Sequence, residues 1–411
     1  MRPPPDNDPR IADSLSSLTR GVRAGDLRTI ARAVVQARDE RLPLAPLVLH
    51  AAWLDARLGL NTSWVLPLAG VVLERLGQGQ EEWLLGTLYE GCAHLHRRAP
   101  ARKTSSETEP ADEDTLLQLC ADPSAVVHLG SVGAAFTLLD GCGATPAQRT
   151  LILGGLRRTI TGGASVHGPW HTRLEALDLR ALQRAAITGA PAWFDRGKLL
   201  HSLLQSPPEA CLEAWIHAIQ SGVPLPDLGE ILVVAASQRM LRFDIAHEFD
   251  RTQPLGFGAL SRTLELCVAL AQRLQEPCGP VAVPLLLAAV WRLSHLGGLD
   301  GQAVGLREPA SGGIPALERA AFTRNPDHAV ALGRGLSRAE LLAFLRRESL
   351  EERLALPQSR ALNLLAVQAA EHGSRLLESG EDRLPLLAAL RLLCSPRQES
   401  GLGRALAAAR E

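Results

Sequence analysis

The sequence predicts an all-α fold, an array of antiparallel helical hairpins that forms one curved array or two packed lobes. Aromatic residues make up only 4% of the 411 residues, and a strand-rich protein needs many more aromatic and β-branched side chains. Leucine, alanine and arginine, which favour helices, take their place. Capping residues mark several helix starts, and apolar stripes follow them. We expect roughly fifteen helices joined by short loops.

The N-terminal part of the chain is expected to be helical after a short polar start. Residues 1–10 are rich in proline and aspartate, which predicts disorder. Residues 11–98 carry apolar residues at helical spacing and are expected to form four or five helices. One of these helices is expected over 46–59, where an apolar stripe runs from Leu47 to Leu54.

Two irregular stretches divide the rest of the chain. Residues 99–112 are polar and aperiodic, which predicts a linker or an exposed loop. A central helical region is expected over 113–296. The glycine-rich residues 297–314 are expected to form a loop before a C-terminal helical region, 315–411.

Sequence signals also predict where individual helices begin. Asp122-Pro123 places a capping side chain before a proline at the first helical position. Other segments match the capping box, in which a Ser or Thr and a Glu or Gln three residues later satisfy two backbone N–H groups. They are Thr145–Gln148, Ser206–Glu209, Ser337–Glu340 and Ser395–Gln398.

The charge balance argues against a nucleic-acid partner. The chain has 43 basic and 44 acidic residues, a net charge of −1, and the two signs are interspersed. The apolar run 281–290 contains Pro284 and is too short to span a bilayer, so we expect a buried helix there and no membrane contact. The N-terminus lacks the apolar core of a signal peptide, and we expect a cytoplasmic protein.

The cysteine pattern favours buried free thiols. The chain has seven cysteines, and the closest pair, Cys267 and Cys278, is eleven residues apart. No CxxC motif is present, so neither disulfides nor structural zinc is expected. The sequence also lacks the glycine-rich motifs that bind nucleotide phosphates. The sequence therefore assigns no cofactor and no metal ligands.

Twelve histidines are the conspicuous reactive set. His128 lies in an apolar segment expected to be a buried helix, where an imidazole is either a hydrogen-bonded core residue or a site residue. His247 lies beside Asp244, Glu248 and Asp250, a group that could bind a divalent metal or relay protons. A polar loop has the same composition. His128, His247 and Asp244 are the candidate catalytic residues.

The other histidines give weaker signals. His94 and His96 are two residues apart, cannot share a helix face and are expected at a cationic helix end. His167 and His171 have the i, i+4 spacing of a helical metal pair, but Gly168-Pro169 between them argues against a regular helix. The remaining single histidines are expected to be structural or solvated: His50, His201, His217, His295, His328 and His372.

Three stretches are similar to a known family. They are Ala125–Phe136, Ser237–Asp244 with the following Gly256–Leu274, and Pro357–Asn363 through Leu386–Arg397. On these stretches the chain resembles questin oxidase-like proteins and the related helical domain attached to bacterial Rieske iron–sulfur proteins. The resemblance implies an all-helical fold and an oxidoreductase activity that uses histidines as ligands or catalytic groups.

The same resemblance places Ser131, Ser261 and Arg360 where the family carries its histidines. A serine hydroxyl is a poor iron ligand, and an arginine cannot be one. His128 lies close enough in sequence to replace Ser131, but residues 256–274 contain no histidine. On this alignment the chain keeps the family's fold and has lost its site.

Two functions follow from the sequence. The missing histidines favour a non-catalytic or degenerate helical protein, a pseudoenzyme, that binds a protein partner or a small hydrophobic molecule between its helices. The alternative is a questin oxidase-like oxidoreductase. In an enzyme we would expect His128 and His247 to face one pocket, where burial and nearby charge tune the pKa of an imidazole.

Overall fold

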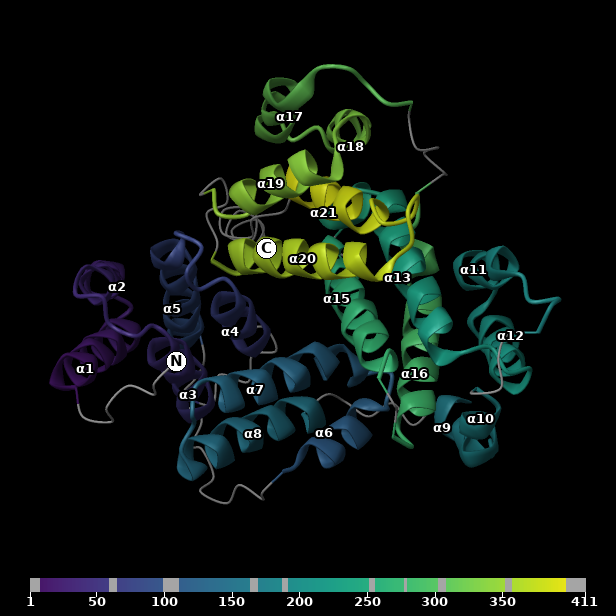
Figure 1. Cartoon of the computed structure of the whole chain (residues 1–411), viewed down its shortest axis with the longest axis horizontal. Coiled ribbons are helices and arrows are strands. Elements are labelled where there is room, and N and C mark those ends of the chain that lie inside the picture. The colour runs from purple at the N-terminus through teal and green to yellow at the C-terminus, as the bar shows by residue number, and fades with distance from the viewer. Residues whose placement is uncertain are drawn as a thin grey trace, which may run out of the picture. The chain divides into compact units, whose positions relative to one another are not determined.

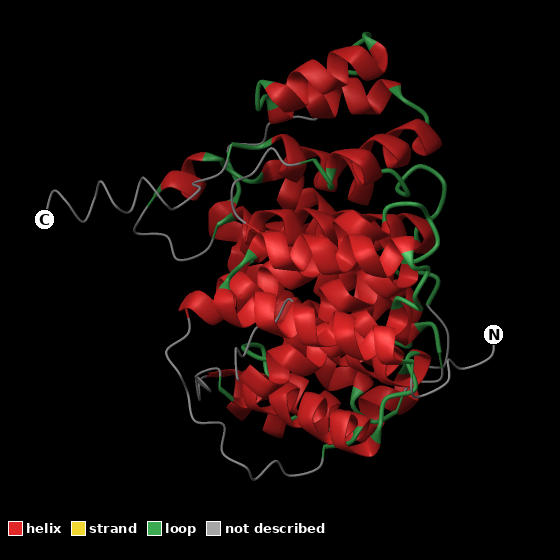
Figure 2. Ribbon diagram, turned by 90° about the vertical axis from the view of Figure 1, so that its left-hand side faces the viewer, coloured by secondary structure: helices red, strands yellow, loops and turns green. Residues whose placement is uncertain are grey.

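The computed structural model describes residues 8–58, 65–98, 111–162, 169–186, 191–250, 256–276, 279–301, 308–351 and 357–396. Over these residues the chain forms 21 α-helices and two 3-10 helices. Figure 2 shows helices and loops but no strand in this part of the chain. The all-α prediction is therefore confirmed. Helices outnumber the prediction because several have ten residues or fewer, such as α10 (Leu179–Ala185).

The chain divides into two compact units, each of which collects segments that are distant in the sequence. Unit 1 comprises residues 1–119, 128–164 and 356–365, and unit 2 comprises residues 120–127, 165–355 and 366–411. The antiparallel hairpin arrangement of the helices stays a prediction.

Unit 1 is built around a helix that is apolar on nearly every side. Its helices are α1 (Pro9–Ala24), α2 (Leu27–Asp39), α3 (Ala45–Leu58), α4 (Val65–Glu74), α5 (Glu81–Arg98), α7 (Leu129–Gly141), α8 (Pro146–Thr161) and all but the last residue of α6 (Glu113–Cys120). Most of α3 is buried, as expected for a helix without a wide polar face. It packs against α4, α5 and α8, while α1 packs against α2 and α5 (Figure 1).

Unit 2 holds the longer list of helices. They are α9 (Pro169–Glu175), α10, α11 (Arg196–Gln205), α12 (Pro208–Gln220), α13 (Leu225–Arg242), α14 (Ala246–Phe249), α15 (Phe257–Leu274), α16 (Ala282–Ser294), the 3-10 helix η2 (His295–Leu299), α17 (Gly313–Phe322), α18 (Pro326–Gly335), α19 (Arg338–Glu348) and α21 (Leu384–Cys394). The helix α20 (Pro357–Leu376) begins in unit 1 and ends in unit 2.

In unit 2, α13 packs along much of its length against α15. A Cβ atom at Gly229 of α13 would lie 3.0 Å from the Cα atom of Ala271 in α15. Glycine is therefore needed where the two backbones approach, because any larger residue would push the helices apart.

One apolar window in the described part of the chain is long enough to cross a bilayer. It spans Ala282–Leu299, and 72% of it is buried inside the structure. A core helix of a folded domain has this property as well, and the prediction of a buried helix over 281–290 is confirmed.

Two of the predicted capping boxes form as expected. The Thr145 side chain accepts a hydrogen bond from the backbone N–H of Gln148, whose side chain accepts from the backbone N–H of Thr145. Ser337 and Glu340 make the same reciprocal pair at the start of α19. These boxes position α8 and α19 because they satisfy N–H groups that lack a partner within the helix.

Two other predicted helix starts are wrong. Pro208 takes the first helical position of α12, so Pro207 becomes its cap and Ser206 instead ends α11. Asp122 accepts a hydrogen bond from the N–H of Ser124 at 2.7 Å, but it caps a turn. The 3-10 helix η1 (Val126–His128) follows this turn, and α7 begins only at Leu129.

The remaining predicted boundaries fall partly outside the described residues. Residues 1–7, 99–110, 302–307 and 397–411 lie outside them, and the box Ser395–Gln398 runs into the last of these ranges. Pro9 and Arg10 already belong to α1, which Asp8 caps, so the predicted N-terminal disorder is wrong for these two residues. Asp112 accepts the backbone N–H of Thr115 at the start of α6.

Candidate functional site

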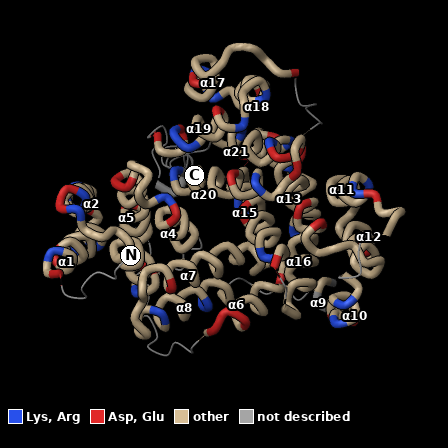
Figure 3. Tube along the Cα trace, in the orientation of Figure 1, with Lys and Arg blue, Asp and Glu red and all other residues tan. Residues whose placement is uncertain are grey.

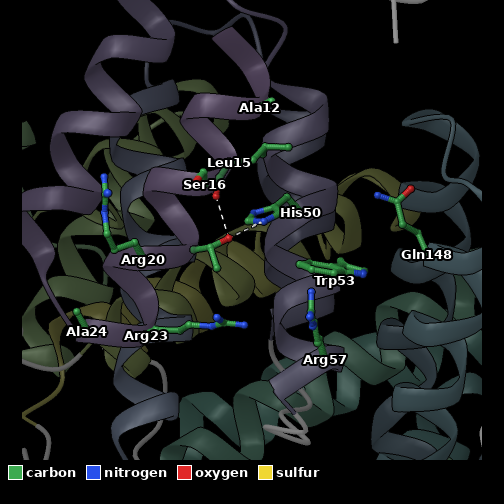
Figure 4. A pocket seen from close by; sticks show the side chains of 11 residues that line it. Ala12, Leu15, Ser16, Arg20, Arg23, Ala24, His50, Trp53, Arg57 and Gln148 are labelled. Atoms are coloured by element: carbon green, nitrogen blue, oxygen red, sulfur yellow. Dashed lines mark hydrogen bonds between the residues drawn. The ribbon is translucent and has the colours of Figure 1, made fainter. Parts of the chain in front are cut away.

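Among the residues that the structure describes, an open groove in unit 1 has a volume of about 890 Å³ (Figure 4). Its walls come from α1 and α3, and Gln148 of α8 completes the lining. The lining residues are Ala12, Leu15, Ser16, Thr19, Arg20, Arg23, Ala24, His50, Trp53, Arg57 and Gln148.

Helical spacing brings the groove residues onto two facing surfaces. On α1, Ala12, Ser16, Thr19 and Arg23 recur every three or four residues and so lie on one face. Asp8 caps the start of this helix, and Gly25 ends it with a φ of 65°.

On α3, three residues form a stack along the helix axis. His50, Trp53 and Arg57 are spaced i, i+3 and i+7. The His50 and Trp53 rings have centroids 5.4 Å apart at an angle of 28°. The Arg57 guanidinium lies 4.8 Å from the centroid of the Trp53 ring, within cation–π range. We call these three residues the α3 stack, which Figure 4 shows in side view.

The inner end of the α3 stack is fixed by hydrogen bonds. His50 is only 8% exposed, and its Nδ1 lies 3.0 Å from the hydroxyl of Tyr89. The Tyr89 hydroxyl also donates a hydrogen bond to the Leu47 carbonyl at 2.6 Å. The other ring nitrogen, Nε2, lies 3.0 Å from the Thr19 hydroxyl.

The protonation state of His50 follows from its burial. Burial lowers the pKa of His50 to about 4, so the ring is neutral near pH 7. The Thr19 hydroxyl beside Nε2 also donates to the Leu15 carbonyl at 2.8 Å.

The outer end of the groove is positively charged. Arg20, Arg23 and Arg57 are exposed, and none of the described residues places a carboxylate within ion-pair distance of them. The eleven lining residues include no Asp or Glu. In Figure 4, Arg23 and Arg57 extend toward the space below Trp53, whereas Arg20 points away from it. Guanidinium groups in such a setting bind oxoanions.

This charge is local to the groove. Figure 3 shows basic and acidic residues interspersed along individual helices of the described chain, without one continuous basic stripe. The charged residues that line the groove are all basic, whereas the helices of the described chain carry charges of both signs.

The candidate catalytic histidines occupy separate units. His128 is the last residue of η1 and the N-cap of α7 in unit 1, so its predicted place inside an apolar α-helix is wrong. A turn after Asp122 and the 3-10 helix delay the α-helix, which leaves His128 half-buried at its start. His247 lies in α14 of unit 2. Their predicted shared pocket stays a prediction.

Two carboxylates near His247 accept hydrogen bonds from backbone N–H groups at helix starts. Asp244 is exposed and accepts the backbone N–H of Ala246 at 2.9 Å. Glu248 accepts the N–H of Phe257, the first residue of α15, also at 2.9 Å. The His247 ring packs against Phe243, with centroids 6.3 Å apart. These contacts agree with the polar-loop interpretation, and a catalytic role for His247 and Asp244 stays a prediction.

The residues at the family's histidine positions do not resemble a metal site. Ser131 and Ser261 are buried within α7 and α15, and Arg360 forms an ion pair with Glu90. Ser261 Oγ is buried and forms no hydrogen bond within the described structure. A search of the described residues finds no group of three His, Cys, Asp or Glu side chains that could hold a metal. The described residues at these positions therefore do not fit the iron that the resemblance implies.

The cysteines match the prediction of free thiols wherever the structure describes them. Cys142 is half-buried, and the other described cysteines are buried: Cys92, Cys120, Cys211, Cys267 and Cys394. Burial raises the pKa of Cys120 and of Cys211 to about 12, so these thiols are protonated near neutral pH and are weak nucleophiles. Cys278 and His167 lie outside the described residues.

Sequence reasoning grouped His50 with the structural histidines and overlooked the groove. The spacing of His50, Trp53 and Arg57 was the available signal, because it puts two rings and a cation on one helix face. Comparison with known proteins adds no further guide: no family model, no curated protein and no solved structure matches this chain.

Proposed function

We propose that this protein is a non-catalytic helical binding protein, and that its ligand is a small hydrophobic molecule held in the groove of unit 1. The observation that carries the proposal is the groove itself, whose volume of about 890 Å³ suits a drug-sized molecule. Ala12, Leu15, Ala24 and Trp53 supply apolar surface there. A concave site of this size favours a small ligand over a protein partner, which needs a larger surface.

Binding is favoured over catalysis by the state of the titratable group in the groove. His50 is neutral, and both of its ring nitrogens already have partners, Tyr89 and Thr19. A general base needs a nitrogen that can reach the substrate. His50 therefore serves to hold Trp53 in place, which is a positioning role.

The test uses N-phenyl-1-naphthylamine, a neutral molecule whose fluorescence rises when it leaves water. We expect saturable binding to the purified protein. Ala12→Trp places a large side chain in the groove, because Ala12 is exposed and lines it, and should abolish most of this binding. Asp13→Trp is the matched control, since Asp13 is the exposed neighbour on α1 that does not line the groove.

Equal binding by the two tryptophan variants and the parent would show that the probe binds elsewhere, and the proposal would fail. A stoichiometric metal in the purified protein that is lost in His128→Ala would instead support the oxidoreductase alternative.

A further inference from the structure

Resting on the proposed function, we infer that the groove selects a hydrophobic molecule that carries an oxoanion, such as a carboxylate, sulfonate or phosphate. The anion would be bound by Arg57 and Arg23, and the apolar body would lie along α1. The charge of the groove, together with its volume, thus indicates the chemical class of the ligand.

The charge of the groove favours an anionic ligand. Three arginines line the groove, no described carboxylate pairs with them, and no lining residue is acidic. Some surface arginines elsewhere in unit 1 do have such partners: Arg10 pairs with Asp8, and Arg149 pairs with Asp140. Cations that face a concave surface without a counter-ion attract an anionic ligand to it.

Arg57 is held in place before a ligand binds. Its guanidinium lies on the Trp53 ring, Trp53 stacks on His50, and His50 is fixed by Tyr89 and Thr19. A long exposed side chain normally loses conformational freedom when it binds an anion. The α3 stack restricts that freedom in advance, while the N–H groups at the edge of the guanidinium stay available for an oxoanion.

An apolar wall lies beside these cations in the groove. Ala12, Leu15 and Ala24 line the α1 side of the groove. An inorganic anion would leave this wall exposed to water, whereas a neutral hydrophobic molecule would leave the arginines unused. A molecule with both features uses the whole groove.

A matched pair of fluorescent probes tests the inference. 8-Anilinonaphthalene-1-sulfonate has the skeleton of N-phenyl-1-naphthylamine and adds one sulfonate. We expect the sulfonate to bind about tenfold more tightly at low salt, because hydrogen bonds to charged groups are stronger than neutral ones. Added salt should reduce this advantage, since the arginines are exposed.

Variants assign the effect to the proposed residues. Arg57→Gln should remove most of the advantage of the sulfonate, measured within the variant as the ratio of the dissociation constants of the two probes. Arg57→Lys should restore only part of it, because lysine keeps the charge and loses the planar fork. Arg28→Gln is the control, since Arg28 is an exposed arginine of unit 1 that does not line the groove.

The outcomes separate the inference from the proposed function. Equal affinity of the parent for both probes, or equal effects of Arg57→Gln and Arg28→Gln, would overturn the anion inference and leave the binding function intact. If neither probe binds in the groove, both proposals are wrong.

Discussion

His50 shows how one residue can couple the stability of unit 1 to pH. Its pKa of about 4 lies below the usual 6.5 because the charged ring would lose its hydration on burial. The unfolded chain therefore takes up this proton first as pH falls. The stabilisation is complete above about pH 6.5 and is lost as pH falls toward 4, with a total on the order of 3 kcal/mol.

Urea unfolding of the parent and of His50→Gln at several pH values between 7.5 and 4 checks this prediction. The free energy of unfolding of the parent should fall more steeply than that of His50→Gln, which has no ring to protonate. Parallel curves for the two proteins would mean that His50 keeps an ordinary pKa.

The sequence could identify some residues of the site but not their role. The stripe over 46–59 correctly predicted α3 (Ala45–Leu58), and the His50, Trp53 and Arg57 spacing was readable within it. The partners of His50, however, are Thr19 and Tyr89, which lie 31 and 39 residues away in the sequence. Helical periodicity reports which residues share a face, and it does not report which other helix covers that face.

At the scale of single elements, the predicted capping box at Thr145 forms, whereas the one at Ser206 does not. Thr145→Ala should destabilise the protein by about 1 kcal/mol, because the backbone N–H of Gln148 loses its acceptor at the start of α8. Ser206→Ala should change the free energy of unfolding by less than about 0.5 kcal/mol, because Ser206 caps no helix start.

Urea unfolding of the two alanine variants under identical conditions provides the comparison. Equal losses would mean that the assigned caps do not explain the stability of these helix starts. The failed prediction at Ser206 has a simple physical origin. Two prolines follow it, either of which can occupy the first helical position, and the sequence pattern alone does not choose between them.

At the scale of the whole molecule, the helical class was predictable and the composition of the two units was not. Helix class depends on composition and local periodicity, which the sequence contains directly. Assignment to a unit depends on packing between distant segments. Residues 356–365, near the C-terminal end, belong to unit 1 with residues 1–119. No local sequence pattern predicts that this distant segment packs in unit 1.

The ion pair of Arg360 with Glu90 is the contact through which this returning segment can be tested. The side chains are 9% and 19% exposed, so loss of one partner leaves a charge in a poorly solvated place. Glu90→Gln weakens this buried ion pair and should therefore lower the free energy of unfolding by more than the ~1 kcal/mol typical of an exposed pair. The double variant Glu90→Leu with Arg360→Met should be more stable than Glu90→Gln, because both charges are then removed from the interior.

The exposed pair of Arg149 and Asp140 in the same unit is the natural control, with side chains that are 37% and 67% exposed. Asp140→Asn should cost no more than about 1 kcal/mol, since water screens this pair. Equal effects of Glu90→Gln and Asp140→Asn in urea unfolding would show that the 356–365 segment contributes no buried charge pair to unit 1. A large loss confined to the Glu90 variant would instead show that a segment from the far end of the chain stabilises the unit that contains the groove.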